Sequence, residues 1–261
     1  MKYWINGTVK SGQGIELPLN SDAWLRGDGL FESIRVVGEQ VYFLERHLTR
    51  ISSSIARFSF PDLDLSVVRT AISELVTGNS SALSKMRLTF YRDGLLLISL
   101  SDASKKPESI RCAVDEYGFH SDSLTSGSKN SSYFSYMQRR SSAKQAGCDD
   151  VLITNSAGEI VESSLANVLF EVGSELITPP LGSGALPGIT RALILDWFPD
   201  VIERKQLVSE LNHISGAALL SSIHGLIPIT EIAGLPLNIS PKIRDLADRF
   251  EEKARNQPNY A

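Results

Sequence analysis

Three short motifs between Ser128 and Arg191 constrain this chain more than any other feature of its sequence. One lysine, Lys129, lies in a segment of serine, glycine and asparagine residues. An acidic motif, Glu162-Ser-Ser-Leu-Ala-Asn167, follows further along the chain. The last motif, Leu186-Pro-Gly-Ile-Thr-Arg191, opens a segment with helical spacing. The chain is thus organised around an amine, a carboxylate and a helix that begins at a glycine.

The first two motifs suggest chemistry on a bound ring. The small neighbours of Lys129 suit a place where an amine is enclosed, loses its water and acts as nucleophile and base. Glu162, held by serine and by Asn167, could keep the nitrogen of a pyridine ring protonated, so that the ring accepts electrons. The alternatives are an exposed lysine and a strand-end acid with Asn167 at a turn.

The third motif suggests a phosphate site. Helix-start amides at Gly188, Ile189 and Thr190 favour an anion, and the Thr190 hydroxyl adds a donor. Ser221 and Ser222 could supply further donors, and Arg50 could be another phosphate ligand. The alternatives are that the segment from Gly188 is an ordinary capped helix, that the two serines only form a turn and that Arg50 is an exposed charge on a helix.

Apolar spacing predicts an α+β fold of two domains. The Ser- and Gly-rich segment Ser121–Ser132 reads as a connector, so we expect a small N-terminal domain over 1–118 and a larger C-terminal domain over 119–261. Strands are expected over 30–37, 85–91 and 95–100, in hairpins of 151–154 with 160–161 and of 167–172 with 175–178, and as a buried strand with a loop over 217–229. Helices are expected over 44–58, 63–76, 133–146, 189–198 and 240–254, with a further helix start over 209–216.

Bulk composition excludes several classes of protein. With 26 basic and 30 acidic residues the net charge is -4, which points to neither nucleic acid nor an anionic membrane. The two cysteines have no metal-binding or redox spacing. No segment has the length of a membrane span or a signal peptide, so we expect a cytoplasmic protein that binds small molecules.

In their order and spacing these motifs resemble the class IV aminotransferase family, the fold-type IV pyridoxal-phosphate enzymes. The resemblance implies a homodimer of two-domain subunits, similar to D-amino acid aminotransferase, with pyridoxal 5'-phosphate in the interdomain cleft. It gives Lys129 the role of the Schiff-base lysine and Glu162 that of the carboxylate facing the pyridine nitrogen. Further cofactor-binding positions implied are Arg50, Tyr133, Asn167, Gly188, Ile189, Thr190, Ser221 and Ser222.

The subfamily is indicated by the run Gly27-Asp-Gly-Leu-Phe-Glu-Ser-Ile-Arg35. It resembles 4-amino-4-deoxychorismate lyases, which release pyruvate to give 4-aminobenzoate for folate biosynthesis. We assign Phe31, Ser33 and Arg92 to the substrate side. An aminotransferase for branched-chain or D-amino acids is the alternative, because Thr178-Pro-Pro resembles the branched-chain enzymes. A non-catalytic protein that binds the cofactor is a remote third possibility.

Overall fold

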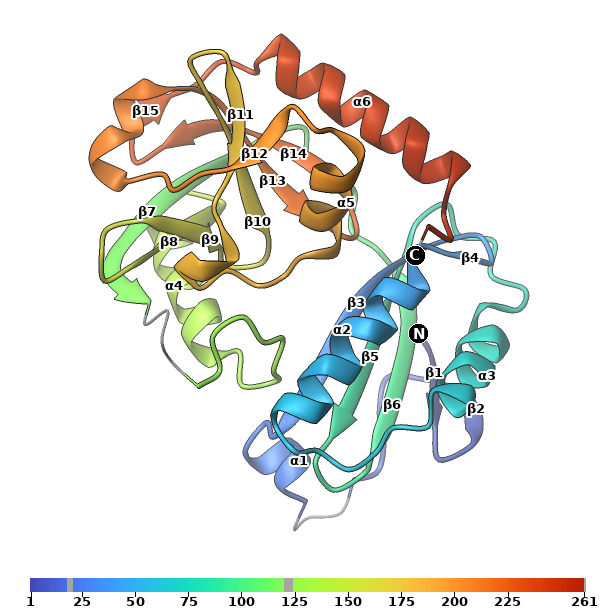
Figure 1. Ribbon diagram of the computed structural model, residues 1–261. Coiled ribbons are helices and arrows are strands. Elements are labelled where there is room, and N and C mark those ends of the chain that lie inside the picture. The colour runs from blue at the N-terminus through green and yellow to red at the C-terminus, as the bar shows by residue number, and fades with distance from the viewer. Residues whose placement is uncertain (18–20, 120–123, 261) are drawn as a thin grey trace. The chain divides into compact units, whose positions relative to one another are not determined.

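The computed structural model describes residues 1–17, 21–119 and 124–260. The chain forms two compact units (Figure 1). The first contains Met1–Lys105, Ser128–Ser132 and Asn256–Ala261. The second contains Lys106–Gly127 and Tyr133–Arg255. The α+β fold class is confirmed, and each unit is built around its own sheet.

The first unit is a six-stranded sheet in the order β2-β1-β6-β5-β3-β4. Asn6 and Gly7 both have positive φ, the conformation of a tight turn between two antiparallel strands. The strands are β1 (Lys2–Ile5), β2 (Thr8–Ser11), β3 (Gly29–Val37), β4 (Gln40–Val41), β5 (Ser84–Tyr91) and β6 (Leu96–Asp102). Helix α1 (Asp22–Leu25) precedes β3.

Two longer helices cover one face of this sheet. Helix α2 (Leu44–Arg57) and helix α3 (Leu65–Val76) bury apolar side chains against β3, β5 and β6. Strand side chains alternate between faces, so Leu30, Ile34 and Val36 point into this core. The neighbouring positions of β3, including Phe31 and Ser33, therefore face away from the helices.

The second unit is a nine-stranded sheet in the order β12-β11-β10-β13-β14-β7-β8-β9, with β15 beside β14. Its strands are β7 (Ile110–Phe119), β8 (Asp150–Asn155), β9 (Ile160–Ser163), β10 (Asn167–Val172), β11 (Glu175–Thr178), β12 (Val201–Glu203), β13 (Ile214–Ser221), β14 (Gly225–Ile232) and β15 (Leu235–Pro236). Its helices are α4 (Phe134–Gln145), α5 (Ile189–Trp197) and α6 (Pro241–Asn256), with 3-10 turns at Leu181–Ser183 and Val208–His213.

The boundary between the units differs from the expected one at 118. Strand β7 pairs in parallel with β8 and with β14, so it belongs to the second sheet, and the N-terminal segment of the first unit ends at Lys105. Segment Ser128–Ser132, expected in a connector, pairs instead with the first unit. Residues 121–123 of that connector lie outside the described residues.

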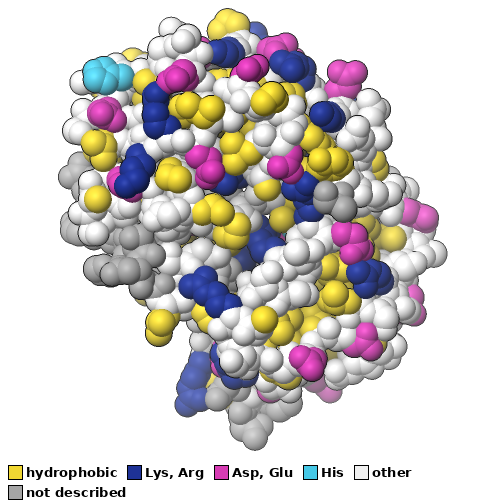
Figure 2. All heavy atoms as spheres, viewed as in Figure 1, with side chains coloured by type: hydrophobic (Ala, Val, Ile, Leu, Met, Phe, Trp, Pro, Cys, Tyr) yellow, Lys and Arg dark blue, Asp and Glu magenta, His cyan; other side chains and the backbone are white. Residues whose placement is uncertain are grey.

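Two local predictions were wrong. The expected buried strand with a loop over 217–229 contains two strands, the antiparallel pair β13 and β14, joined by a short turn. The expected helix start over 209–216 is a 3-10 turn followed directly by β13. Within the described part of the chain no helix is long and apolar enough to cross a membrane. Basic and acidic side chains are interspersed on the face shown in Figure 2.

Candidate functional site

The backbone of Lys129 is fixed to the edge of β3. The amide of Phe31 donates to the carbonyl of Lys129 at 2.8 Å, and the amide of Ser131 donates to the carbonyl of Gly29 at 2.7 Å. Leu30 and Asn130 form the antiparallel bridge between these two hydrogen bonds. The lysine is therefore held in strand register in the first unit, although it lies far along the chain from β3.

The side chain of Lys129 lies over an aromatic ring. Its Nζ is 4.4 Å from the ring centroid of Phe31, and the guanidinium carbon of Arg87 is 3.7 Å from the same centroid. Cations are attracted to the face of such a ring. Ser33 is opposite Arg87 in the ladder between β3 and β5, so all four side chains gather on the sheet face away from the helices.

Sequence reasoning missed Arg87. The signal was available, because the alternation of apolar residues in 85–91 places Arg87 on the open face of its strand. What the sequence does not give is the register that sets Arg87 beside Phe31.

On the helix side of β3, Glu32 is buried between two basic residues of α2. Arg50 donates from Nε to Oε1 at 2.8 Å and from Nη2 to Oε2 at 2.5 Å, and Nδ1 of His47 is 2.7 Å from Oε2. Burial alone would raise the pKa of Glu32, but the charge of Arg50 and the hydrogen bond from His47 lower it to about 2. Glu32 is therefore ionised, and Arg50 is fixed by it.

Burial lowers the pKa of His47 below its ordinary value, and the positive charges of Arg50 and Lys129 act in the same direction. The imidazole is then neutral near pH 7. Because the ionised Glu32 only accepts, the N–H at Nδ1 of His47 donates the hydrogen bond between them. The charge of Lys129 thus acts on His47, the residue that contacts Glu32 beside Arg50. Binding of phosphate by Arg50 stays a prediction.

In the second unit Glu162 is held by groups from separate segments. Its Oε2 accepts from Nδ2 of Asn167 at 3.1 Å and from the amide of Leu186 at 3.0 Å. Asn167 also donates to the carbonyl of Leu186 at 3.0 Å. The amide of Asn167 thereby joins the carboxylate on β9 to the loop that leads into α5.

A tyrosine that the sequence did not indicate also contacts this carboxylate. The hydroxyl of Tyr136, on the first turn of α4, is hydrogen-bonded to Glu162. Burial, and next the negative charge of Glu162, raise the pKa of Tyr136. Its ring stacks on Tyr133, with centroids 4.8 Å apart and an interplanar angle of 18°. Tyr133, the predicted cofactor ligand, thus contacts the residue that reaches Glu162.

The start of α5 is built tightly against Asn167. A Cβ added at Gly188 would lie 1.8 Å from Oδ1 of Asn167, so only glycine fits there. Ile189 and Thr190 form the first turn of the helix and are buried. The helix-start amides and the Thr190 hydroxyl are the donor types that a phosphate needs.

The turn carrying Ser221 and Ser222 lies at the same end of this sheet. Asn167 pairs with Leu220 in the ladder of β10 and β13, so the turn directly follows the position of Asn167. The hydroxyl oxygen of Ser221 accepts from the amides of Ile223 and His224 at 3.3 and 3.4 Å. Asn167 therefore lies beside Gly188 and opposite Leu220, the residue before Ser221. Binding of phosphate by these segments stays a prediction.

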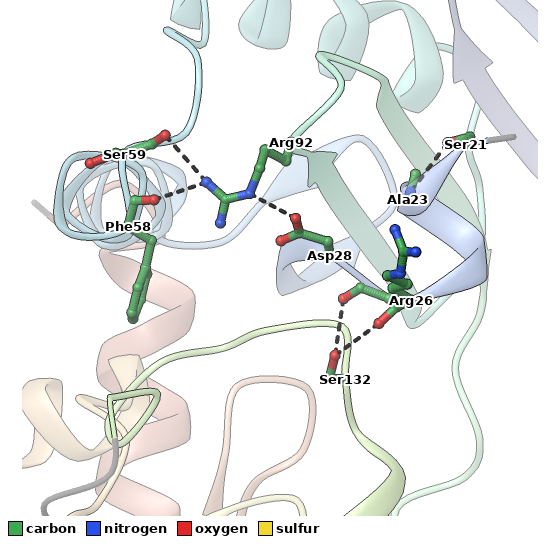
Figure 3. A network of polar contacts seen from close by, with 9 residues as sticks. Ser21, Ala23, Arg26, Asp28, Phe58, Ser59, Arg92 and Ser132 are labelled. Carbon is green, nitrogen blue, oxygen red and sulfur yellow. Dashed lines mark hydrogen bonds and ion pairs between the residues drawn. The ribbon is translucent and has the colours of Figure 1, made fainter.

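Arg92, predicted on the substrate side, is part of a loop network (Figure 3). Its Nε donates to Oδ2 of Asp28 at 2.7 Å, and its Nη1 donates to the carbonyls of Phe58 and Ser59 at 3.0 and 3.3 Å. Ser132 donates to the carbonyls of Arg26 and Gly27, both at 3.2 Å. The network ties the loop before β3 to the segment that carries Lys129. Contact of Arg92 with a substrate stays a prediction.

No three histidine, cysteine, aspartate or glutamate side chains gather in a metal-binding arrangement across residues 1–17, 21–119 and 124–260.

Comparison with known proteins identifies the family. A family model described as amino-transferase class IV matches residues 29–232. The chain is 24% identical to branched-chain-amino-acid transaminase 1 of Bacillus subtilis, covering 85% of this chain and 72% of that protein. It is 18% identical to an aminodeoxychorismate lyase of Vibrio harveyi, covering 95% and 98%.

The solved structures agree on the fold. The PLP-bound form of a hypothetical aminotransferase from Mycobacterium tuberculosis has a TM-score of 0.88 at 21% identity, covering 96% of this chain and 98% of that chain. At that identity the likeness establishes the fold alone. The family match spans most of the sequence and includes all three motifs. The chain therefore belongs to the class IV aminotransferase family and is a pyridoxal-phosphate enzyme.

Proposed function

We propose that the protein is a 4-amino-4-deoxychorismate lyase, which releases pyruvate and gives 4-aminobenzoate for folate biosynthesis. The observation that carries the proposal is the Phe31 ring beside the amine of Lys129, with Arg87 on the same ring. A ring without a hydroxyl offers an apolar surface to a substrate that becomes aromatic. The guanidinium of Arg87 offers a partner for a substrate carboxylate.

Each motif residue has a role in this proposal. Pyridoxal phosphate, when bound, supplies the carbonyl that captures the substrate amine and the ring that accepts electrons. Lys129 would hold the cofactor through its amine and would take the proton from the substrate carbon that bears the nitrogen. Glu162 accepts a hydrogen bond from the ring nitrogen. Thr190 and Ser222, with the amides of the α5 start, bind the phosphate.

Arg50, a residue of the first unit, remains assigned to the phosphate. Its guanidinium is oriented by the buried Glu32, which is 1% exposed. Phe31, Ser33 and Arg92 remain assigned to the substrate side. We further propose that the protein is cytoplasmic and that it is a homodimer. Sedimentation velocity of the purified protein would test the dimer.

An aminotransferase acting on branched-chain or D-amino acids is the second candidate. The likeness to the Bacillus subtilis transaminase and the Thr178-Pro-Pro motif favour it. In that reaction Lys129 would move the proton to a different carbon, and hydrolysis of the C–N bond would release a keto acid. The two candidates share the roles of Lys129 and Glu162 and differ in the product released.

A first experiment tests the cofactor lysine. Protein supplied with pyridoxal phosphate is reduced with borohydride and digested, and the modified peptide is identified by mass spectrometry. We expect a pyridoxyl group on Lys129 and none in Lys129→Arg, which keeps the charge. Stable modification of a different lysine in the wild-type protein would overturn the assignment.

A second experiment separates the two activities. The enzyme receives 4-amino-4-deoxychorismate alone, or branched-chain and D-amino acids with 2-oxoglutarate. Pyruvate and 4-aminobenzoate formed in equal amounts without an added keto acid would support the lyase. Amino transfer without release of pyruvate from 4-amino-4-deoxychorismate would refute it.

A further inference from the structure

Tyr136 contacts Glu162 from a different element than the other donors do. Helix α4 packs on β8, and the Tyr136 ring lies against Ala143, Val151 and Ile153. Ile153 is opposite Glu162 in the ladder of β8 and β9, so both side chains point toward α4. The ring is thereby seated on an apolar cluster, and its hydroxyl reaches the carboxylate.

Three donors converge on the one carboxylate. Asn167 comes from the start of β10, the Leu186 amide from the loop before α5, and the Tyr136 hydroxyl from α4. An ionised carboxylate only accepts hydrogen bonds, so each donor restricts its orientation without competing for a proton. Charge-assisted hydrogen bonds of this kind are stronger than those between neutral groups.

The phenol stays a donor under ordinary conditions. Burial raises the pKa of Tyr136, and the charge of Glu162 adds to this, so the hydroxyl keeps its proton near pH 7. The stack with Tyr133 limits rotation of the ring. The side chain is therefore a fixed support and not a group that titrates during turnover.

We propose that Tyr136 is a positioning residue that orients the Glu162 carboxylate toward the nitrogen of the cofactor ring. This rests on the proposed role of Glu162 at that nitrogen. Tyr136 itself contacts neither substrate nor cofactor in this assignment. Tyr136 acts on cofactor binding only through its hydrogen bond to Glu162. Its loss should therefore weaken binding only of a cofactor whose ring carries a nitrogen.

The test compares two cofactors in the full-length protein. One is pyridoxal phosphate, and the other is its carbocyclic analogue, in which a C–H group replaces the ring nitrogen. Dissociation constants are measured by absorbance titration for the wild type, Tyr136→Phe and Glu162→Gln. Tyr42→Phe is the matched control, because Tyr42 is a buried tyrosine whose ring packs beside Arg35 in the first unit.

We expect Tyr136→Phe to weaken binding of pyridoxal phosphate about tenfold and to leave binding of the analogue within about twofold. Tyr42→Phe should change neither constant. Equal weakening for both cofactors would mean that Tyr136 only supports the fold, and an unchanged constant for pyridoxal phosphate would mean that its hydroxyl does nothing to Glu162. Either result overturns the proposal.

The Glu162→Gln variant separates this failure from failure of the proposed function. If Glu162→Gln also binds both cofactors as the wild type does, Glu162 does not serve the ring nitrogen and both assignments fall. If Glu162→Gln weakens binding of pyridoxal phosphate alone while Tyr136→Phe does not, the role of Glu162 stands and only that of Tyr136 is lost.

Discussion

Arg50 donates through Nε and Nη2 to the two carboxylate oxygens of Glu32, a residue that is 1% exposed. A two-point contact of this kind fixes the plane of the guanidinium as well as its position. Arg50, which is expected to bind phosphate, is thus oriented by Glu32, which is not a predicted phosphate ligand.

Glu32→Gln should destabilise the protein by about 3 kcal/mol, because it leaves the Arg50 charge buried without its counter-ion. The free energy of unfolding in urea measures this. The matched control is Glu45→Gln, since Glu45 pairs with Arg69 on the surface, where the two side chains are 51% and 45% exposed. That change should cost less than about 1 kcal/mol. Equal losses in the two variants would show that burial does not decide the strength of the pair.

His47 and Glu32 both make the free energy of unfolding decrease as the pH falls. The lowered pKa of His47 means that the unfolded chain takes up a proton near pH 6.5 and the folded chain does not, so stability is lost below that pH. Glu32 has its pKa lowered from 4.5 to about 2, so its contribution is complete above pH 4.5 and is lost toward pH 2.

His47→Gln should therefore flatten the first part of this dependence. Glutamine can donate to Glu32 but takes up no proton on unfolding. Urea unfolding of the wild type and of His47→Gln at several pH values between about 5 and 7.5 measures the two slopes. A slope that the substitution leaves unchanged would contradict a His47 that remains neutral in the fold.

Much of the first unit could be predicted because its pattern is local. The alternation in 30–37 and the helical spacing in 44–58 depend on neighbouring residues, and β3 and α2 match them closely. Strand β7 was missed because its partners, β8 and β14, lie later in the sequence. The pairing of β13 with β14 was missed because both strands are apolar, so the pattern of 217–229 does not show where one strand ends and the next begins.

The residues of the candidate site also divide into those that the sequence indicated and those that depend on tertiary contacts. The resemblance to the family grouped Lys129, Glu162 and Gly188, and their roles stay predictions. Arg87 and Tyr136 were not identified, since each acts through tertiary contacts that no local pattern encodes. Strand register brings Arg87 to Phe31, and the packing of α4 on β8 brings Tyr136 to Glu162.

Arg92 and Asp28 should act together. Their side chains are 45% and 36% exposed, so the ion pair itself is weak, but Arg92 also donates to the two carbonyls that follow α2. We expect Arg92→Gln and Asp28→Asn each to cost about 1 kcal/mol of unfolding free energy, and the double variant to cost less than the sum. Urea unfolding of the four proteins gives the coupling. Additive losses would mean that the pair shown in Figure 3 adds no stability.

The contact between Gly188 and Asn167 gives the sharpest prediction for the phosphate site. Gly188→Ala places a methyl group where Oδ1 of Asn167 lies, and Asn167 cannot move away without breaking its bonds to Glu162 and Leu186. We expect a loss of about 2 kcal/mol in unfolding free energy and weaker binding of pyridoxal phosphate. In Gly182→Ala, the control, no atom lies within 4 Å of the added carbon, and both quantities should be unchanged.

The reason for the loss is tested by a second substitution. Asn167→Ala removes the atom that the new methyl group meets, so Gly188→Ala should cost clearly less in the Asn167→Ala protein than in the wild type. The unfolding free energies of the wild type, the two single variants and the double variant give this difference. If Gly188→Ala costs the same in both backgrounds, its effect comes from the helix start itself and not from the packing of Gly188 on Asn167.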